Sequence, residues 1–329
     1  MLLYAGIDEA GYGPMLGPLC VGLCVIGVDD VDDHAGAPDV WGALAPAVVR
    51  TAREAQHTGG VAVDDSKKLK LSNGLKTRHP LVHLEKGVLA CGRSLWGVDD
   101  ALPTDCARLC ERLGCAHNDE GVALPIANDE GVLRLVGAKV TGAMERGGVR
   151  VLDLSCRTLD PPVFNERLSR LGTKAGVSWS LVQELVARVW RSHAVDGAEV
   201  TPRLVLDRQG GRTDYLEALR ACVGAAPTIT AIGVTPERSA YEIADGPRRL
   251  RVLVQREAET DHFPVALASM TAKLVRELAM ERFNRAWRTR LPELKPTAGY
   301  VTDARRWLSE VRGAGVARAG ELEALVRRA

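Results

Sequence analysis

The chain lacks the features that would place it at once in several classes of protein. No segment reaches the ~18 continuous apolar residues that a membrane-spanning helix requires. The apolar N-terminal stretch has no basic region ahead of it and runs into acidic residues, unlike a secretory signal. Internal repeats and low-complexity tracts are also missing. We therefore expect a globular, cytoplasmic protein, and its 329 residues with 46% hydrophobic content suffice for one elaborated domain or two.

A large net charge is also missing. Lys and Arg number 43 against 42 Asp and Glu, so the formal net charge is +1 and the molecule as a whole is not a polybasic nucleic-acid binder. The charge is unevenly distributed, because residues 246–329 carry 17 Lys and Arg against 10 Asp and Glu. Such an excess usually marks a solvated helical surface, and it can also hold a polyanion. The sequence leaves both interpretations open.

The eight cysteines do not form the paired C-x2-C knuckles that are typical of zinc sites. The nearest group of candidate ligands is Cys106, Cys110, Cys115 and His117, with the spacing C-x3-C-x4-C-x-H. Cys106 and Cys110 lie one turn apart on a helix predicted over 103–113, together with two leucines. We therefore favour reduced, buried thiols over a metal site.

The N-terminal segment MLLYAGIDEAGYGPMLGP is the most informative part of the sequence. The apolar run Leu2 to Ile7 predicts a buried strand that delivers Asp8 and Glu9 at its end. Successive strand residues point to opposite faces, so these two acids share a face only if the strand ends or bulges there. The glycines that follow allow a ligand to approach the backbone closely. A solvated turn after a strand explains the same pattern equally well.

The segment VAVDDSKKLK, residues 61–70, carries a second group of polar residues. It can be a loop that places Ser66 and Lys67 against phosphate oxygens. It can equally be the capped start of a helix, with Asp65 or Ser66 as the N-cap. The two interpretations are compatible.

Two further acidic positions follow predicted strands in the second half of the chain. The strand at 203–206 ends in Asp207, directly before a Gly-Gly loop, which is a typical place for a site residue in an α/β sheet. An ordinary turn aspartate explains Asp207 in isolation. The strand at 250–255 leads to REAETDHFP, and then to a long helix from Val265 to about Arg290. The small residues in the first turns of that helix allow it to lie close to a sheet. This would bring the preceding acids near those of neighbouring strands; they are Glu257, Glu259 and Asp261.

The rest of the pattern mixes strands and helices, which indicates an α/β fold. The remaining predicted strands are at 18–28, 132–141, 148–154, 228–234 and 239–243, and the remaining predicted helices are at 40–55, 162–171, 178–193 and 213–223.

Five blocks of this sequence resemble the ribonuclease HII family, and they occur in the family's order. Four of them resemble the family segments GIDEAGRGP, DSKKL, AASILAK and KGYGT, and the other is the Asp-tipped strand VLD. The resemblance covers both ends of the chain and about two-thirds of its residues. The segments 29–60 and 87–150 look like elaborations that compact members lack. The five blocks in this chain read GIDEAGYGPMLGP, DDSKKL, VLD, ALASMTAKLVREL and TAGYVTDARRWL.

The resemblance implies an RNase H-like α/β fold, a mixed sheet flanked by helices with a C-terminal helical region. Residues 1–263 would form the catalytic core, and residues 264–329 would complete the substrate cleft. The resemblance also implies four acids that bind two divalent cations, Mg²⁺ or Mn²⁺. Carried onto this sequence, the four acids are Asp8, Glu9, Asp207 and Glu259.

The fourth of these acids has two candidates in the sequence. Counting back from Ser269 without a gap reaches Glu259, where ribonuclease HII usually has Asp. Asp261 would need a shift of two residues. We favour Glu259 because the longer carboxylate can still bind magnesium, and the similar ribonuclease HIII group accepts Glu there.

The chemistry of phosphodiester cleavage is consistent with such a group of acids. The reaction must activate a water and stabilise a leaving oxyanion, and two cations ~3.5–4 Å apart do both. Magnesium prefers oxygen ligands, so carboxylates are the expected ligands and Cys or His are not. Carboxylates that gather without a cation repel one another.

The same resemblance implies how the substrate is recognised. The backbone of Gly11, Tyr12 and Gly13 would sense the 2′-OH that distinguishes RNA from DNA. Tyr300 would stack on the sugar beside the scissile ribonucleotide, although it can also be a half-buried aromatic residue. The family has Arg where this chain has Tyr12, so the grip on phosphate would be weaker. The phosphate contacts would be Ser66, Lys67 and Lys273, of which Lys273 can also be a surface lysine that extends from its helix.

The activity implied by the resemblance is that of a monomeric, metal-dependent endoribonuclease. It would cleave the RNA strand of RNA–DNA hybrids and single ribonucleotides embedded in duplex DNA, leaving a 3′-OH and a 5′-phosphate. Two alternatives remain, a non-catalytic protein that binds RNA–DNA hybrids and a DNA nuclease on the same scaffold.

Overall fold

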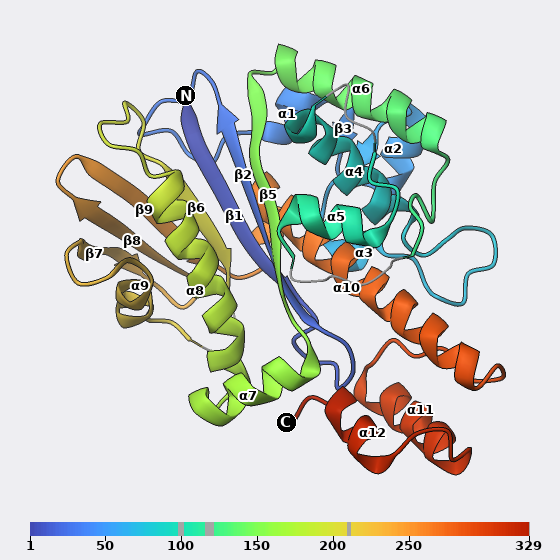
Figure 1. Ribbon diagram of the computed structural model, residues 1–329. Helices are drawn as coiled ribbons and strands as arrows, with labels where there is room; N and C mark the ends of the chain where they lie inside the picture. The colour runs from blue at the N-terminus through green and yellow to red at the C-terminus, as the bar shows by residue number, and fades with distance from the viewer. Residues whose placement is uncertain (98–101, 116–121, 209–211, 329) are drawn as a thin grey trace.

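The computed structural model describes residues 1–97, 102–115, 122–208 and 212–328. Its centre is a seven-stranded mixed sheet, with helices on both faces (Figure 1). The expected mixed sheet flanked by helices is therefore confirmed. β1, β6 and β9 are parallel to one another, and the other neighbours are antiparallel. The strand order is β5 (Val149–Leu159), β2 (Leu19–Val28), β1 (Leu2–Ala10), β6 (Arg203–Asp207), β9 (Arg248–Gln255), β8 (Arg238–Asp245) and β7 (Thr228–Val234).

β1 and β2 occupy the interior of the sheet because their residues are almost all apolar or small, and can be buried on both faces. They form the expected hairpin, with a regular antiparallel register from Leu2↔Val28 to Ala10↔Cys20. The expectation that β1 ends before Asp8 is wrong, because the strand continues through Ala10.

One face of the sheet is covered by α10 (Phe263–Arg290), which lies across β1 and β2. Two glycines of these strands permit the close approach. A Cβ at Gly6 would lie 2.2 Å from the backbone nitrogen of Val265, and one at Gly22 would lie 2.2 Å from the carbonyl oxygen of Ala268. Any side chain at either position would push the helix off the sheet.

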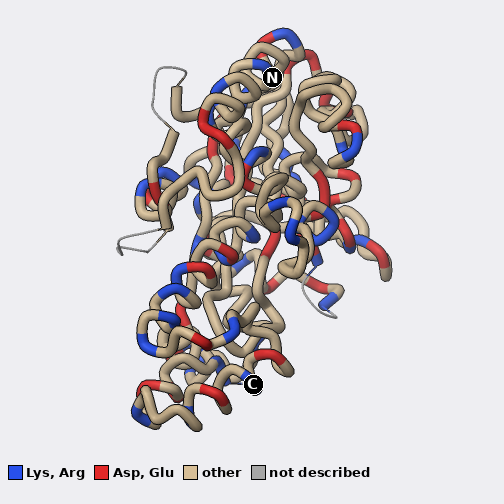
Figure 2. The backbone as a smooth tube through the Cα atoms, turned by 90° about the vertical axis from the view of Figure 1, so that its right-hand side faces the viewer, with Lys and Arg blue, Asp and Glu red and all other residues tan. Residues whose placement is uncertain are grey.

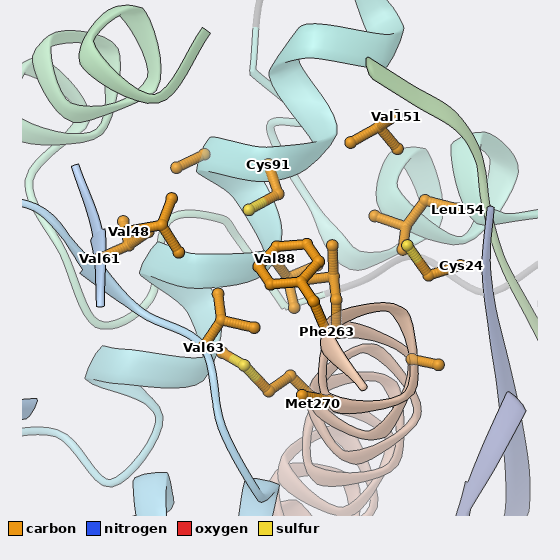
Figure 3. Packing of buried hydrophobic residues seen from close by; sticks show 14 of the residues in the cluster. Cys24, Val48, Val61, Val63, Val88, Cys91, Val151, Leu154, Phe263 and Met270 are labelled. Carbon is orange, nitrogen blue, oxygen red and sulfur yellow. The ribbon is translucent and has the colours of Figure 1, made fainter. Parts of the chain in front are cut away.

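The core on this face also includes α4 (Val82–Trp96) and the short strands β3 (Val48–Val49) and β4 (Val61–Ala62). Figure 3 shows Phe263 and Met270 of α10 packed among the apolar residues of these elements. The opposite face carries a second core, formed with α7 (Pro161–Leu171), α8 (Lys174–Ser192) and α9 (Leu216–Val223).

Two predictions for the elaborated segments are wrong. The single helix expected at 40–55 is divided at Pro46, which has no backbone N–H to continue it. The strand expected at 132–141 is part of a helix, which Asp129 caps and which buries apolar residues at helical spacing. The described helices that lie wholly within these segments are α1 (Val40–Leu44), α2 (Ala52–Thr58), α5 (Cys106–Leu113) and α6 (Glu130–Arg146).

The C-terminal helices α11 (Val301–Gly313) and α12 (Ala319–Leu325) build a small third core with the end of α10. Leu16, from the loop between β1 and β2, is completely buried in it beside Trp307. The backbone of Arg327 also donates a hydrogen bond to the carbonyl of Met15 at 2.8 Å. No described helix combines the length and the apolar character needed to span a bilayer.

Candidate active site

Asp8 and Asp207 lie level with each other on neighbouring parallel strands. β1 and β6 pair in parallel up to Ile7 and Leu206, so the next residue of each strand is one of the two acids. Asp8 lies on the face of β1 that α10 covers, since residues two apart on a strand share a face and Gly6 contacts α10. Only 9% of Asp8 is exposed.

Glu9 lies just beyond this pair. The ladder between β1 and β2 is regular through Glu9↔Val21, so alternation directs Glu9 to the opposite face of the strand from Asp8. β6 ends at Asp207, level with Asp8, and therefore leaves Glu9 without a neighbour on that side. The charge of Glu9 nevertheless raises the pKa of Asp8, so the two carboxylates are close.

A short turn between β9 and α10 carries Glu259 to the same edge of the sheet. The turn is a 3-10 helix, Ala258–Thr260, and Glu257 before it has the left-handed backbone conformation, with φ of 52°. Asp207 accepts a hydrogen bond from the backbone N–H of Ala258 at 3.1 Å, which fixes the turn to the end of β6. Glu259 is 7% exposed, and its Oε2 atom is buried with no hydrogen-bond partner among the described residues.

Asp261 lies two residues further on and has different neighbours. Its Oδ2 accepts a hydrogen bond from the side chain of Gln255 at 2.8 Å. Its charge acts on Tyr4 and His262, whereas the charge of Glu259 acts on Asp8. Of the two candidates for the fourth acid, Glu259 is therefore the one that approaches Asp8.

Burial and mutual repulsion disfavour the charged form of the acids at this edge. Burial raises the pKa of Asp8 well above its usual range, and the charges of Glu9, Asp207 and Glu259 raise it further. Burial also raises the pKa values of Asp207 and Glu259. Buried carboxylates that repel each other in this way need a cation nearby to stay ionised.

Lys67 is a basic residue whose charge acts on Asp207 and Glu259. It lies on α3 (Ser66–Leu69), and the Asp65 side chain caps this helix by accepting a hydrogen bond from the Lys67 backbone at 2.9 Å. The predicted helix cap is therefore confirmed, with Asp65 as the N-cap. Burial works against the Lys67 ammonium, but surrounding carboxylates outweigh it and raise the Lys67 pKa; they are Asp65, Asp8, Glu259 and Asp207.

Ser66 is buried and joins α3 to α10. Its hydroxyl lies 3.0 Å from that of Ser269, and Ser269 in turn hydrogen-bonds Asp8, which lowers the Asp8 pKa against the effect of burial. The sequence offered Ser269 only as a reference point for counting, because its place beside Asp8 depends on how α10 lies on β1.

Lys273 is not a surface lysine, since only 9% of it is exposed. Its Nζ atom forms an ion pair with Glu277 one turn later, at 2.9 Å. Glu277 also lies 3.1 Å from the guanidinium of Arg276 and 3.7 Å from the ammonium of Lys70. Burial opposes ionisation of Glu277, but the three cations lower its pKa. Lys273 thus belongs to a buried charge network with a net positive charge.

The loop after β1, residues 11–18, lies beside the turn before α11 that carries Tyr300. The backbone N–H groups of Met15 and Leu16 donate to the carbonyl of Gly299, at 2.8 and 3.1 Å. Tyr300 is 49% exposed, so it is available for contact with a ligand. Tyr12 is also exposed, and nothing lies near the position of a Cβ on Gly13.

Arg276 of α10 contacts both of these segments, a role that the sequence did not predict. It is completely buried, and its guanidinium carbon lies 5.5 Å from the centre of the Tyr300 ring. Its Nη2 donates to the carbonyl of Ala298 at 2.8 Å. A Cβ on Gly11, where φ is 90°, would lie 2.7 Å from the Arg276 side chain. An arginine one turn after Lys273 gives no signal of this role, because such a residue normally faces solvent.

Tyr4 and His262 form a second connection that the sequence did not reveal. Both are buried, and the Tyr4 hydroxyl hydrogen-bonds Nδ1 of His262. Tyr4 shares a face of β1 with Asp8, and the His262 backbone donates to the carbonyl of Ala258 at 3.0 Å. This contact therefore joins the strand of Asp8 to the turn of Glu259.

The donor set at this edge suits a hard divalent cation. Carboxylates are the ligands that Mg²⁺ and Mn²⁺ prefer. The buried Oε2 atom of Glu259, which has no hydrogen-bond partner among the described residues, could be satisfied by such a cation. Within the described ranges, however, no three side chains of His, Cys, Asp or Glu are grouped closely enough to hold an ion as they stand. Of the cysteines considered for zinc, Cys110 is buried and Cys106 and Cys115 are partly buried, while His117 lies outside the described residues.

Comparisons with known proteins return distant structural likenesses only. No protein-family model and no curated protein matches the chain. An RNase HII from Archaeoglobus fulgidus, solved as a complex with PCNA, is 18% identical with a TM-score of 0.43; 99% of this chain and 94% of that one are covered. A ribonuclease H2 from Pyrococcus horikoshii is 14% identical with a TM-score of 0.40, over 99% and 93% of the two chains.

A Bst-RNase HIII in complex with Mn²⁺ is 17% identical with a TM-score of 0.42, over 99% of this chain and 66% of that one. Likeness at this distance does not decide a function, which has to come from the residues of the site.

Proposed function

We propose that this protein is a divalent-metal-dependent endoribonuclease of the ribonuclease HII type. It cleaves the RNA strand of RNA–DNA hybrids and single ribonucleotides embedded in duplex DNA, and it leaves a 3′-OH and a 5′-phosphate. The observation that carries this proposal is the meeting of Asp8, Asp207 and Glu259, from three separate segments, at one edge of the sheet. The motif resemblance of both ends of the chain supports it.

Asp8, Asp207 and Glu259 would hold Mg²⁺ or Mn²⁺, with Glu9 as the fourth acid. When bound, the cations would activate the attacking water and stabilise the leaving oxyanion. The carboxylates would first have to rotate toward the ion, since the described side chains do not form a closed ligand group. Glu9 would reach it around the strand end, where β6 no longer flanks β1.

Lys67 is the residue best placed to hold a phosphate of the substrate. The charges of the surrounding acids raise the pKa of its ammonium. Ser66 and Lys273 would join it only by giving up their present partners, Ser269 and Glu277. The backbone of residues 11–13 and the exposed ring of Tyr300 would distinguish RNA from DNA. The guanidinium of Arg276 packs against the Tyr300 ring.

The proposal is tested with an end-labelled duplex that contains one ribonucleotide, incubated with Mg²⁺ or Mn²⁺. We expect a single cut at the ribonucleotide, no cut in an all-DNA duplex, and no cut by Asp207→Asn. Equal cleavage of the all-DNA duplex would instead indicate a DNA nuclease.

The main rival is a non-catalytic protein that binds RNA–DNA hybrids, and the retention of Asp8, Glu9 and Asp207 argues against it. The rival predicts tight binding of the hybrid without cutting in either metal. Binding without cutting, under conditions where calorimetry shows that Mn²⁺ is bound, would therefore overturn the proposal.

A further inference from the structure

A groove on the elaborated side of the molecule lies between α2, α4 and α6. Its volume is about 480 Å³, within the range of known ligand sites. Figure 2 looks onto the side of Figure 1 where these three helices lie. α2 and α6 come from the two segments that compact relatives would lack, so the groove is not part of the proposed catalytic apparatus.

The floor and one wall of the groove are apolar. Val132 and Leu135 line it from α6, and they are 43% and 74% exposed, respectively. They lie three residues apart, and therefore on the same side of the helix. The floor continues into buried Val136 and Ala55. A single exposed leucine is ordinary, but apolar side chains that border a hollow mark a place for another apolar group.

The other wall is basic and contains no acid. Arg78, His83 and Lys86 line it. Burial lowers the pKa of Lys86, and the charge of Arg78 lowers it further. Burial likewise lowers the pKa of His83, with Lys86 and Arg78 acting in the same direction. Within the part of the chain that the structure describes, none of the three forms an ion pair with a carboxylate.

Three acids of the surrounding helices are engaged elsewhere. Glu85 of α4 is buried and accepts hydrogen bonds from the backbone of Ile126 and Ala127. Glu54 of α2 caps its own helix through Thr51, and Glu130 of α6 pairs with Arg134. Among the described residues, no carboxylate lines the groove or forms an ion pair with Arg78 or Lys86, so their positive charge is not compensated there.

We propose that this groove docks an acidic, amphipathic segment of a partner protein. Apolar side chains of that segment would cover Val132 and Leu135, and its carboxylates would pair with Arg78 and Lys86. Docking of an amphipathic helix into an apolar groove is a common mode of recognition. The apolar floor argues against nucleic acid, because phosphates gain nothing from contact with leucine and valine.

A peptide-display selection on the full-length protein tests this proposal. The library is selected on the wild type and counter-selected on Leu135→Glu, which removes the apolar wall and adds a repelling charge. We expect enriched peptides to combine Asp or Glu with apolar residues at helical spacing. Binding of a synthetic enriched peptide, measured by fluorescence polarisation, should weaken by about tenfold or more in Leu135→Glu and in Arg78→Glu.

Leu171→Glu is the matched control, because Leu171 is also exposed, at 47%, but ends α7 on the other face of the sheet. It should leave peptide binding unchanged. All three variants should keep the wild-type melting temperature and nuclease activity, so a failure of docking is distinct from a failure of the proposed function. The proposal is overturned if no peptide is enriched, if enriched peptides lack acids, or if oligonucleotides compete for the site and peptides do not bind.

Discussion

Replacing Glu259 by glutamine should have opposite effects on the protein with and without metal. Glu259 is buried among acids, and both burial and the charge of Asp207 raise its pKa. A carboxyl group whose pKa is raised in the folded state costs stability at pH values above that pKa. Glutamine has nearly the same shape and no charge, so the metal-free variant should melt at the same temperature as the wild type or higher.

With metal present, the same substitution should be costly. A carboxylate about 4 Å from a unit positive charge at an effective dielectric of about 20 contributes roughly 4 kcal/mol. This corresponds to about a thousandfold in affinity for a single positive charge. We therefore expect Glu259→Gln to abolish cleavage and to weaken Mn²⁺ binding in calorimetry by at least tenfold.

Asp261→Asn is the matched control for this prediction. The Asp261 side chain accepts a hydrogen bond from Gln255, and Asp261 is not among the groups whose charge raises the pKa of Asp8. The variant should therefore keep its metal affinity and most of its activity. The assay is differential scanning fluorimetry with and without Mn²⁺, followed by cleavage of the duplex that contains one ribonucleotide. Loss of the Mn²⁺-induced stabilisation in Asp261→Asn, with Glu259→Gln unaffected, would refute the assignment and move the fourth ligand to Asp261.

Three further predictions address recognition, packing and charge. Tyr300→Ala should reduce cleavage of single embedded ribonucleotides by tenfold or more while the melting temperature stays within a few degrees; unchanged kinetics would remove the proposed stacking role. Gly6→Ala should cost about 1–3 kcal/mol or more in urea unfolding, because its Cβ would lie 2.2 Å from α10, whereas Gly233→Ala, with open space around it, should cost less. Glu277→Gln should cost about 3–5 kcal/mol at neutral pH, because it leaves buried cations unpaired. The folded-state pKa of Glu277 is lowered, so this difference should be present above its ordinary pKa of about 4.3 and shrink as the pH falls through the folded value; a constant difference between pH 7 and about pH 3 would contradict the ion-pair explanation.

The sequence predicted most of the sheet, because its strands are short apolar runs with clear turn residues between them. Asp8 and Asp207 could be placed at one edge from their positions near strand ends. The strand assigned to 132–141 was wrong because a short run rich in valine and leucine suits either structure, and the helical spacing of Leu133, Val136 and Val140 was the better guide.

Other features of the candidate site could not be predicted, because they depend on how distant segments pack. The burial of Arg276 and its position under Tyr300 require α10 to lie as close to β1 and β2 as Gly6 and Gly22 allow. The pairing of Tyr4 with His262 joins residues far apart in the chain, and neither belongs to a motif. Local patterns carry no information about contacts of this kind.

The small core around Leu16 ties the beginning of the chain to its end. The loop that holds the glycine segment is anchored by helices α11 and α12, and the backbone of Arg327 bonds directly to Met15. We therefore expect removal of the C-terminal helices to loosen this loop. The C-terminal segment therefore helps to hold the surface that is proposed to read the substrate.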